Sequence, residues 1–175
     1  MINRLLRIID YTIVFVLIQV MLLNNLHFLL IATPFLYLYI ILKLPIQTST
    51  VQSLIIAFLV GILIDMFSNT PGMHAAASTL IGFIRPYILQ IFIGKDIPEN
   101  TVIPSYEAFG FAVFTRYTFS LVFIHSTCLL LIESLSLFDP LFLMGRIISC
   151  SLLTCLLVLI TETFYLHNNK NAEQE

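Results

Sequence analysis

Apolar residues run through this chain in stretches long enough to cross a lipid bilayer. A helix rises about 1.5 Å per residue, so the hydrocarbon core of a membrane, about 30 Å thick, takes about 20 residues to cross. Hydrophobic residues make up 59% of the 175 residues and charged residues only 10%, whereas an ordinary soluble domain is roughly 25% charged. A water-soluble globule of this size cannot bury so much apolar surface. The sequence therefore predicts an all-α integral membrane protein.

Turn signals divide the apolar material into six segments, which predict about six transmembrane helices in a single domain over residues 1–175. The predicted spans are 6–24, 27–43, 50–67, 73–93, 106–132 and 141–166. The first two are short, and the polar residues Asn24, Asn25 and His27 lie where they meet. Two short helices joined by a tight turn are the preferred interpretation. One crossing followed by a segment that lies in the interface, which gives five spans, is the alternative.

The distribution of Lys and Arg predicts the orientation. With six spans and a cytoplasmic N-terminus, the cytoplasmic side carries Arg4, Arg7, Lys43, Lys95 and Lys170, and the opposite side carries Arg146. The positive-inside rule favours this arrangement, with both termini in the cytoplasm. The net charge of −2 and the lack of a basic run argue against binding of nucleic acid.

One acid and one base lie inside or beside the third and fourth spans. Charge at membrane depth costs roughly 2.5–3.5 kcal/mol, so Asp65 and Arg85 are candidates for a polar interior or a partner contact. The alternatives are a solvated acid that begins a turn for Asp65, and snorkelling to the interface for Arg85. Pro86 follows Arg85, and a kink there would free carbonyl groups that a guanidinium can satisfy. A direct pair between Asp65 and Arg85 is the weaker interpretation, because they lie near opposite ends of adjacent antiparallel helices.

Small residues accompany these charges. Gly61 lies four residues before Asp65 and shares its helix face. Ala75, Ser78 and Gly82 are spaced three and four apart, which is typical of a close helix–helix contact in a membrane. We therefore expect the third and fourth spans to form a tight hairpin with a rigid turn. The candidate residues for helix packing or partner contact are Gly61, Asp65, Gly72, His74, Ala75, Gly82 and Arg85.

No constellation of residues indicates catalysis, a metal or a cofactor. A metal site needs three or four ligands, and only Asp65 could join His27 and His74. His125 and Ser126 are adjacent, so their side chains point in different directions on a helix and do not form a nucleophile–base pair. Phosphate-binding and zinc-protease motifs are absent from the sequence. The three cysteines lie in apolar stretches without metal-ligand spacing, and we interpret them as small hydrophobic residues.

The remaining polar residues of the spans have simpler interpretations. Glu162, near the cytoplasmic end of the sixth span, is predicted to be a terminal or snorkelling charge. Gln19 and Asn24 are candidates for interhelical hydrogen bonds. The charges nearest the predicted membrane surfaces are interpreted as interfacial anchors: Glu107, Arg116, Glu133, Asp139 and Arg146.

Residues 61–87 resemble the MreD family of rod-shape-determining proteins. The resemblance is carried by Gly61-x-x-x-Asp65, a short turn, Gly72-x-x-Ala75, Gly82 and Tyr87, and by the wider runs Phe67 to Ala77 and Ile84-Arg85-Pro86-Tyr87. The resemblance implies a non-catalytic subunit of the bacterial inner membrane, with a fold similar to the substrate-binding subunits of energy-coupling-factor transporters. The implied partners in cell elongation are an MreC-like protein, MreB filaments, RodA, a penicillin-binding transpeptidase and membrane lipids. A small-molecule or lipid-binding transporter subunit is the alternative.

Overall fold

The protein is described by a computed structural model that covers residue 19 and residues 33–94, 103–134 and 139–172, with the backbone alone for 167–172. These residues are helical or irregular and contain no strand, which confirms the all-α class within the described part of the chain. The helices are α2 (Leu38–Leu42), α3 (Thr50–Ser68), α4 (Met73–Ile93), α5 (Tyr106–Phe109), α6 (Phe111–Glu133) and α7 (Pro140–Ala172).

Four helices are long and apolar enough to cross a membrane: α3, α4, α6 and the Pro140–Leu166 part of α7. The chain is therefore a multi-pass membrane protein. The four correspond to the predicted spans 50–67, 73–93, 106–132 and 141–166, with one difference. The predicted fifth span is interrupted at Gly110, whose φ of 80° belongs to a region that glycine adopts readily. This residue separates the four-residue helix α5 from α6.

The first two predicted spans have a different outcome. Span 6–24 lies outside the described residues except for Gln19. Within span 27–43, the described residues 33–43 do not form a continuous helix: they run without helix up to a turn and then form the five-residue helix α2. We call residues 33–45 the central segment.

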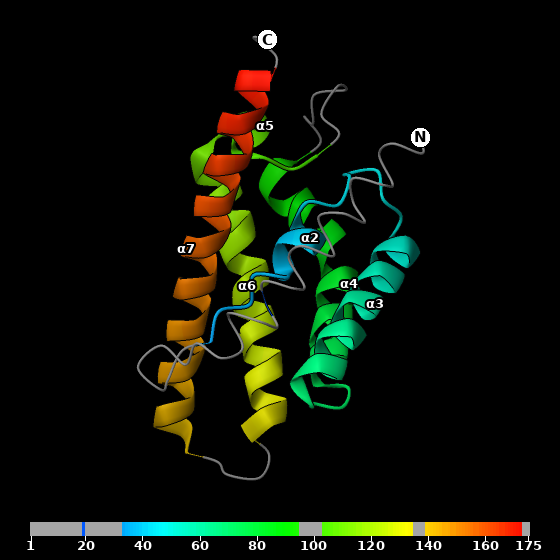
Figure 1. The fold of residues 1–175 in the computed structure, drawn as a ribbon, viewed down its shortest axis with the longest axis vertical. Helices are drawn as coiled ribbons and strands as arrows, with labels where there is room; N and C mark the ends of the chain where they lie inside the picture. Colours follow the sequence, from blue (N-terminus) through cyan, green and yellow to red (C-terminus); the bar gives the residue numbers. More distant parts are fainter. Residues whose placement is uncertain (1–18, 20–32, 95–102, 135–138, 173–175) are drawn as a thin grey trace.

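The four long helices stand side by side, with α3 packed on α4, α4 on α6 and α6 on α7. In Figure 1 the helices follow one another from right to left in that order, and the central segment lies in front of α6 and α4. The turn that joins α3 to α4, the end of α6 and the start of α7 lie at one end of the row, whereas α5 and the end of α7 lie at the other end.

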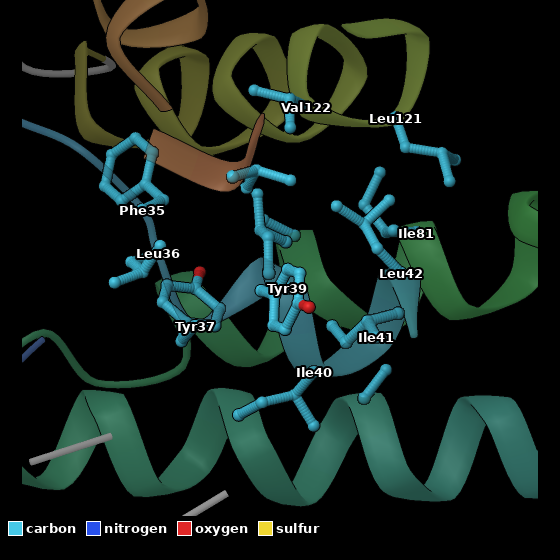
Figure 2. Packing of buried hydrophobic residues seen from close by; sticks show 14 of the residues in the cluster. Phe35, Leu36, Tyr37, Tyr39, Ile40, Ile41, Leu42, Ile81, Leu121 and Val122 are labelled. Atoms are coloured by element: carbon cyan, nitrogen blue, oxygen red, sulfur yellow. The ribbon is translucent and has the colours of Figure 1, made fainter. Parts of the chain in front are cut away.

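The central segment is the core of the molecule. Residues 34–42 and Leu44 are all buried, and they pack against buried residues of α4 and α6 such as Ile81, Leu121 and Val122. Figure 2 shows side chains of the central segment between the surrounding helices, with Ile40 directed toward one of them and Phe35 lying near another. An irregular backbone therefore occupies the middle of a helical membrane protein.

Glycines bring α3 and α4 into backbone contact. A Cβ added at Gly61 would lie 2.5 Å from Ala75 Cα, and one added at Gly82 would lie 2.8 Å from the Ser53 carbonyl oxygen. The turn between the helices passes through Asn69 and Gly72, which have φ values of 55° and 82°. These left-handed conformations suit Asn and Gly. The hairpin is thus as tight as small residues allow.

The outer faces of the helices are apolar. Large exposed hydrophobic side chains recur every three or four residues along α7, for example Met144, Ile148, Leu152, Leu156 and Ile160. Polar side chains are buried instead, among them Asp65, His74, Arg85, His125 and Glu162. This distribution is the reverse of a soluble protein and suits a chain surrounded by lipid.

Candidate functional site

Asp65 caps the start of α4. Its carboxylate accepts hydrogen bonds from the backbone N–H groups of His74 (3.0 Å) and Ala75 (2.9 Å) and from the Thr70 hydroxyl (2.9 Å). The first N–H groups of a helix have no partner within it, and the helix dipole favours a negative charge there. The side chain is buried, so Asp65 is not the solvated acid of the simpler interpretation. It fixes the turn that joins α3 to α4.

Arg85 holds the end of the central segment. The guanidinium is 1% exposed and donates to the Leu44 carbonyl, to the Pro45 carbonyl (3.5 Å) and to the Tyr117 hydroxyl (3.1 Å). Tyr117 in turn donates to the Leu42 carbonyl at 3.1 Å. Arg85 therefore does not snorkel, and it makes no ion pair with Asp65. The two charges act at separate places, each on backbone groups of the same chain.

Tyr37 joins two histidines in the middle of the protein. Its hydroxyl lies 3.0 Å from His74 Nδ1 and 2.6 Å from His125 Nε2. The Phe35 ring packs edge-on against both imidazoles, with ring centroids 5.9 and 5.3 Å away. A hydroxyl has one proton, so it donates to one histidine and accepts from the other. These two hydrogen bonds of Tyr37 connect the central segment to α4 and α6.

Side chains also satisfy the backbone at the start of the central segment. The amide of Gln19 donates to the Pro34 carbonyl (2.9 Å) and accepts from the Leu36 N–H (2.8 Å). Two residues of α7 accept from the same stretch: Thr154 from the Phe35 N–H at 3.0 Å and Cys150 from the Thr33 N–H at 3.4 Å. Cys150 is thus more than a small hydrophobic residue, and Gln19 bonds to the central segment.

A buried ion pair anchors the central segment to α7. Lys43 Nζ lies 2.9 Å from Glu162 Oε1, and Tyr39 donates to Glu162 Oε2 at 2.7 Å. Lys43 also donates to the Pro104 carbonyl at 2.8 Å and lies 5.1 Å from the centre of the Tyr165 ring. Burial lowers the pKa of Lys43, which lies outside the four long helices, and the Glu162 carboxylate acts in the opposite direction. The prediction of a terminal charge at Glu162 is wrong, since its side chain is fully buried.

Several of these contacts hydrogen-bond the backbone of the central segment. In a membrane interior no water is present to bond the backbone, so irregular backbone persists only where protein groups or a hydrated cavity satisfy it. Five side chains bond the backbone of the central segment directly, and these are Gln19, Arg85, Tyr117, Cys150 and Thr154. The candidate site is therefore a set of polar side chains that hold the irregular central segment in place. Within the described residues, no group of three His, Cys, Asp or Glu side chains could hold a metal ion.

The candidate residues from the sequence fall into two groups. Gly61, Asp65, Gly72, His74, Ala75 and Gly82 meet at the α3–α4 hairpin. Arg85 lies apart from them at the end of the central segment. Sequence reasoning missed Tyr37, Tyr117 and Thr154, because aromatic and hydroxyl residues in apolar stretches give no distinctive pattern. For Glu162 a signal existed, since it is the single carboxylate within a strongly apolar helix.

The fold and the site together define a multi-pass, helical membrane protein. Its central segment is irregular, and polar side chains of the surrounding helices hold this segment in place. No family model matches the chain, and no curated protein or solved structure is significantly similar to it.

Proposed function

We propose that this chain is a non-catalytic subunit of the bacterial cell-elongation complex in the inner membrane. It would organise peptidoglycan synthesis, and so cell shape, through contacts with an MreC-like protein and, beside it, RodA and a penicillin-binding transpeptidase. The resemblance of residues 61–87 to the MreD family supplies the identity of the complex. The proposal for the fold includes six spans and the energy-coupling-factor subunit architecture that this resemblance implies.

One observation supports the non-catalytic part of the proposal. The charged side chains within the long helices that are buried, namely Asp65, Arg85 and Glu162, are each engaged with groups of the same chain. A general acid, base or electrostatic catalyst must instead present its group to a substrate. Groups committed to holding the backbone suit a protein that acts by being a rigid body in the membrane.

Partner contact is assigned to the outer helix faces. Those faces carry large apolar side chains that are exposed, such as Phe58 and Leu59 on α3 and Leu152 and Leu156 on α7. Helices in lipid associate through packing of such side chains and through small residues, without a hydrophobic driving force. A scaffold subunit in the membrane therefore recognises partner helices by shape.

Co-purification tests the proposed function. A tagged chain expressed at its natural level should retain the MreC-like protein of the same cells after solubilisation in mild detergent, and its depletion should turn rod-shaped cells round. A tagged multi-pass protein of unrelated function is the control for non-specific membrane capture. Normal cell width after depletion, together with no retained MreC-like protein, would contradict the proposed function.

A small-molecule or lipid-binding transporter subunit is the second candidate. It is favoured by buried polar atoms of α6, such as His125 Nδ1 and Ser126 Oγ, that have no hydrogen-bond partner in the described part of the chain. This function requires an organic molecule bound in stoichiometric amount to the purified protein. Extraction with organic solvent followed by mass spectrometry measures that amount directly.

A further inference from the structure

Arg116 differs from the other charged side chains of the four long helices. It is exposed on α6, and no hydrogen bond or ion pair joins it to another of the described residues. The other charged side chains of these helices have partners, and these are Asp65, Arg85, Glu133, Arg146 and Glu162. The charge of Arg116 is therefore left to be balanced from outside the described part of the chain.

Arg116 lies near one end of the part of α6 that crosses the membrane. The helix begins at Phe111, and a rise of 1.5 Å per residue places Arg116 about 7–8 Å along it. The next residue, Tyr117, donates to the Leu42 carbonyl, so Arg116 is level with the end of the central segment. Side chains lean toward the N-terminus of their helix, and a long cationic side chain at this depth extends to the membrane surface. The phosphate groups of lipids lie at that surface.

A stripe of exposed side chains continues from Arg116 along α6. Its members are spaced four, three and four residues apart, so they share one face of the helix. The rings of Phe119 and Phe123 stack on each other with their centroids 5.9 Å apart, and both are exposed. The other side of α6 is buried in the core through residues such as Phe114 and Leu121. We call the exposed residues Ala112, Arg116, Phe119 and Phe123 the α6 stripe.

The α6 stripe contains no counter-charge of its own. Residues three or four positions from Arg116 are its neighbours on the helix surface. They are Ala112, Val113, Phe119 and Ser120, and none of them is acidic. A cation among apolar groups in a membrane costs free energy unless water or an anion balances it. The stripe therefore suits a ligand with an anionic group at one end and an apolar body at the other.

The shape of the stripe favours a lipid over the helix of a partner protein. Helices in membranes approach one another closely where both carry small residues, whereas Phe119 and Phe123 project from α6 and keep another backbone away. A flexible acyl chain can follow the surface of these rings. At the membrane surface, the planar guanidinium of Arg116 matches the oxygens of a phosphate group in a bidentate geometry.

We propose that the α6 stripe binds a phospholipid whose headgroup has a net negative charge. Arg116 donates to the lipid phosphate, Ala112 leaves space for the headgroup beside it, and the rings of Phe119 and Phe123 contact an acyl chain. A zwitterionic headgroup carries its own cation, so it balances Arg116 less well. The proposal does not rest on membership of the elongation complex, because it follows from one unpaired charge and the apolar face below it.

Quenching of a single Trp tests the proposal, since the natural chain contains none. The full chain with Phe123→Trp is reconstituted in phosphatidylcholine bilayers that contain phosphatidylglycerol. Bromine atoms are placed on the acyl chains of one of the two lipids at a time, and the two quenching curves give the relative affinity at the Trp. We expect phosphatidylglycerol to bind beside this Trp about fivefold more tightly than phosphatidylcholine, because a basic side chain near the membrane surface attracts anionic lipid by about that factor.

Two variants of the reporter chain assign this preference to Arg116. Arg116→Gln should reduce the ratio to about one, and Arg116→Lys should keep part of it, because lysine retains the charge without the bidentate geometry. Arg146→Gln is the matched control and should leave the ratio unchanged, since Arg146 is paired with Glu133. The melting temperature (Tm), measured by circular dichroism, checks that each variant is folded.

A second reporter distinguishes a site from a general attraction of anionic lipid to the protein. Leu59→Trp lies on the exposed face of α3, a helix whose sequence contains no Lys or Arg, and this Trp should show a ratio of about one. An equal preference at both reporters, or a preference that survives Arg116→Gln, overturns the proposal. A ratio of about one at Phe123→Trp also overturns it, and the acid of a partner protein would then be the counter-charge to seek.

Discussion

At the scale of single residues, the charges inside this membrane protein stabilise its own backbone. Asp65 supplies a negative charge to the start of α4, and Arg85 donates to carbonyl groups at the end of the central segment. A charge in a membrane span usually marks a pathway or a functional contact. Here each charge is matched to a backbone group that the surrounding lipid leaves without water.

Asp65→Asn should destabilise the protein by about 1–3 kcal/mol, because a carboxylate that accepts three hydrogen bonds is replaced by an amide with one acceptor oxygen. Thermal unfolding of the purified protein measures the change. Asp139→Asn is the control: Asp139 is exposed and caps the start of α7 through the Leu141 N–H at 3.1 Å, and Asn caps helices as well as Asp does. Equal losses in the two variants would contradict the role assigned to the buried carboxylate.

At the scale of elements, the hairpin of α3 and α4 depends on the absence of side chains where the backbones touch. Gly61 and Gly82 have different neighbours across the interface, the Ala75 and Ser53 backbones respectively. In lipid, helices associate through such close packing because the hydrophobic effect does not drive them together. The hairpin in turn fixes the position of His74 against the central segment.

Gly61→Ala should move α4 away from α3, because the new Cβ would lie 2.5 Å from Ala75 Cα, a backbone atom that cannot yield locally. We expect a loss of roughly 1–3 kcal/mol, as for other overpacked sites. Gly145→Ala is the matched control in α7, where an added Cβ meets nothing within 4 Å, and better helix propensity should raise stability by up to about 1 kcal/mol. A stable Gly61→Ala protein with an unchanged Tm would refute the close contact.

The Lys43–Glu162 pair is the corresponding link between the central segment and α7. Glu162→Gln should cost about 3 kcal/mol, because removal of one partner leaves a largely buried charge unpaired. Restoring neutrality with Lys43→Met in the same chain should recover part of that loss, and a double-mutant cycle measures the coupling. Arg146→Met provides the comparison, since the Arg146–Glu133 pair is exposed and should contribute less than about 1 kcal/mol. Additive losses at Lys43 and Glu162 would show that the pair does not act as a unit.

At the scale of the whole molecule, the described helices form a row with large apolar side chains exposed on its outer faces and hydrogen-bonded polar side chains buried inside. Lys43 bonds Glu162 in the C-terminal part of α7 and the Pro104 carbonyl just before α5, and α5 lies at the end of the row opposite the α3–α4 turn. From the positive-inside rule we expect that end to face the cytoplasm and the α3–α4 turn to face the other side of the membrane.

Cysteine labelling checks this orientation. A membrane-impermeant maleimide applied to intact spheroplasts should label Pro71→Cys in the α3–α4 turn, and it should label Gln47→Cys only after the membrane is opened. Both positions are exposed. The parent chain, in which Cys150 and Cys155 are buried and Cys128 is partly buried, provides the background. Labelling of Gln47→Cys in intact spheroplasts would reverse the assignment.

The predictability of each part follows from the range of its interactions. The spans of α3, α4 and α7 were predictable because membrane thickness sets a length that can be counted along the sequence. The close approach of α3 and α4 was indicated by local spacing of Gly61, Ala75 and Gly82. The central segment was not predicted, because residues 33–43 are as apolar as a helix that crosses the bilayer. Composition alone does not show that side chains from distant helices will satisfy an irregular backbone.

The sequence by itself determined that this is a helical membrane protein and where most of its long helices begin and end. These features were predictable because the length of an apolar stretch and the turn residues beside it are local properties. Only the tertiary structure decided what the polar residues do. Asp65 and Arg85 became two separate backbone anchors, and Glu162 became the partner of Lys43. The physical reason is that a buried polar group takes its role from the atom that satisfies it, and that atom lies far away along the chain.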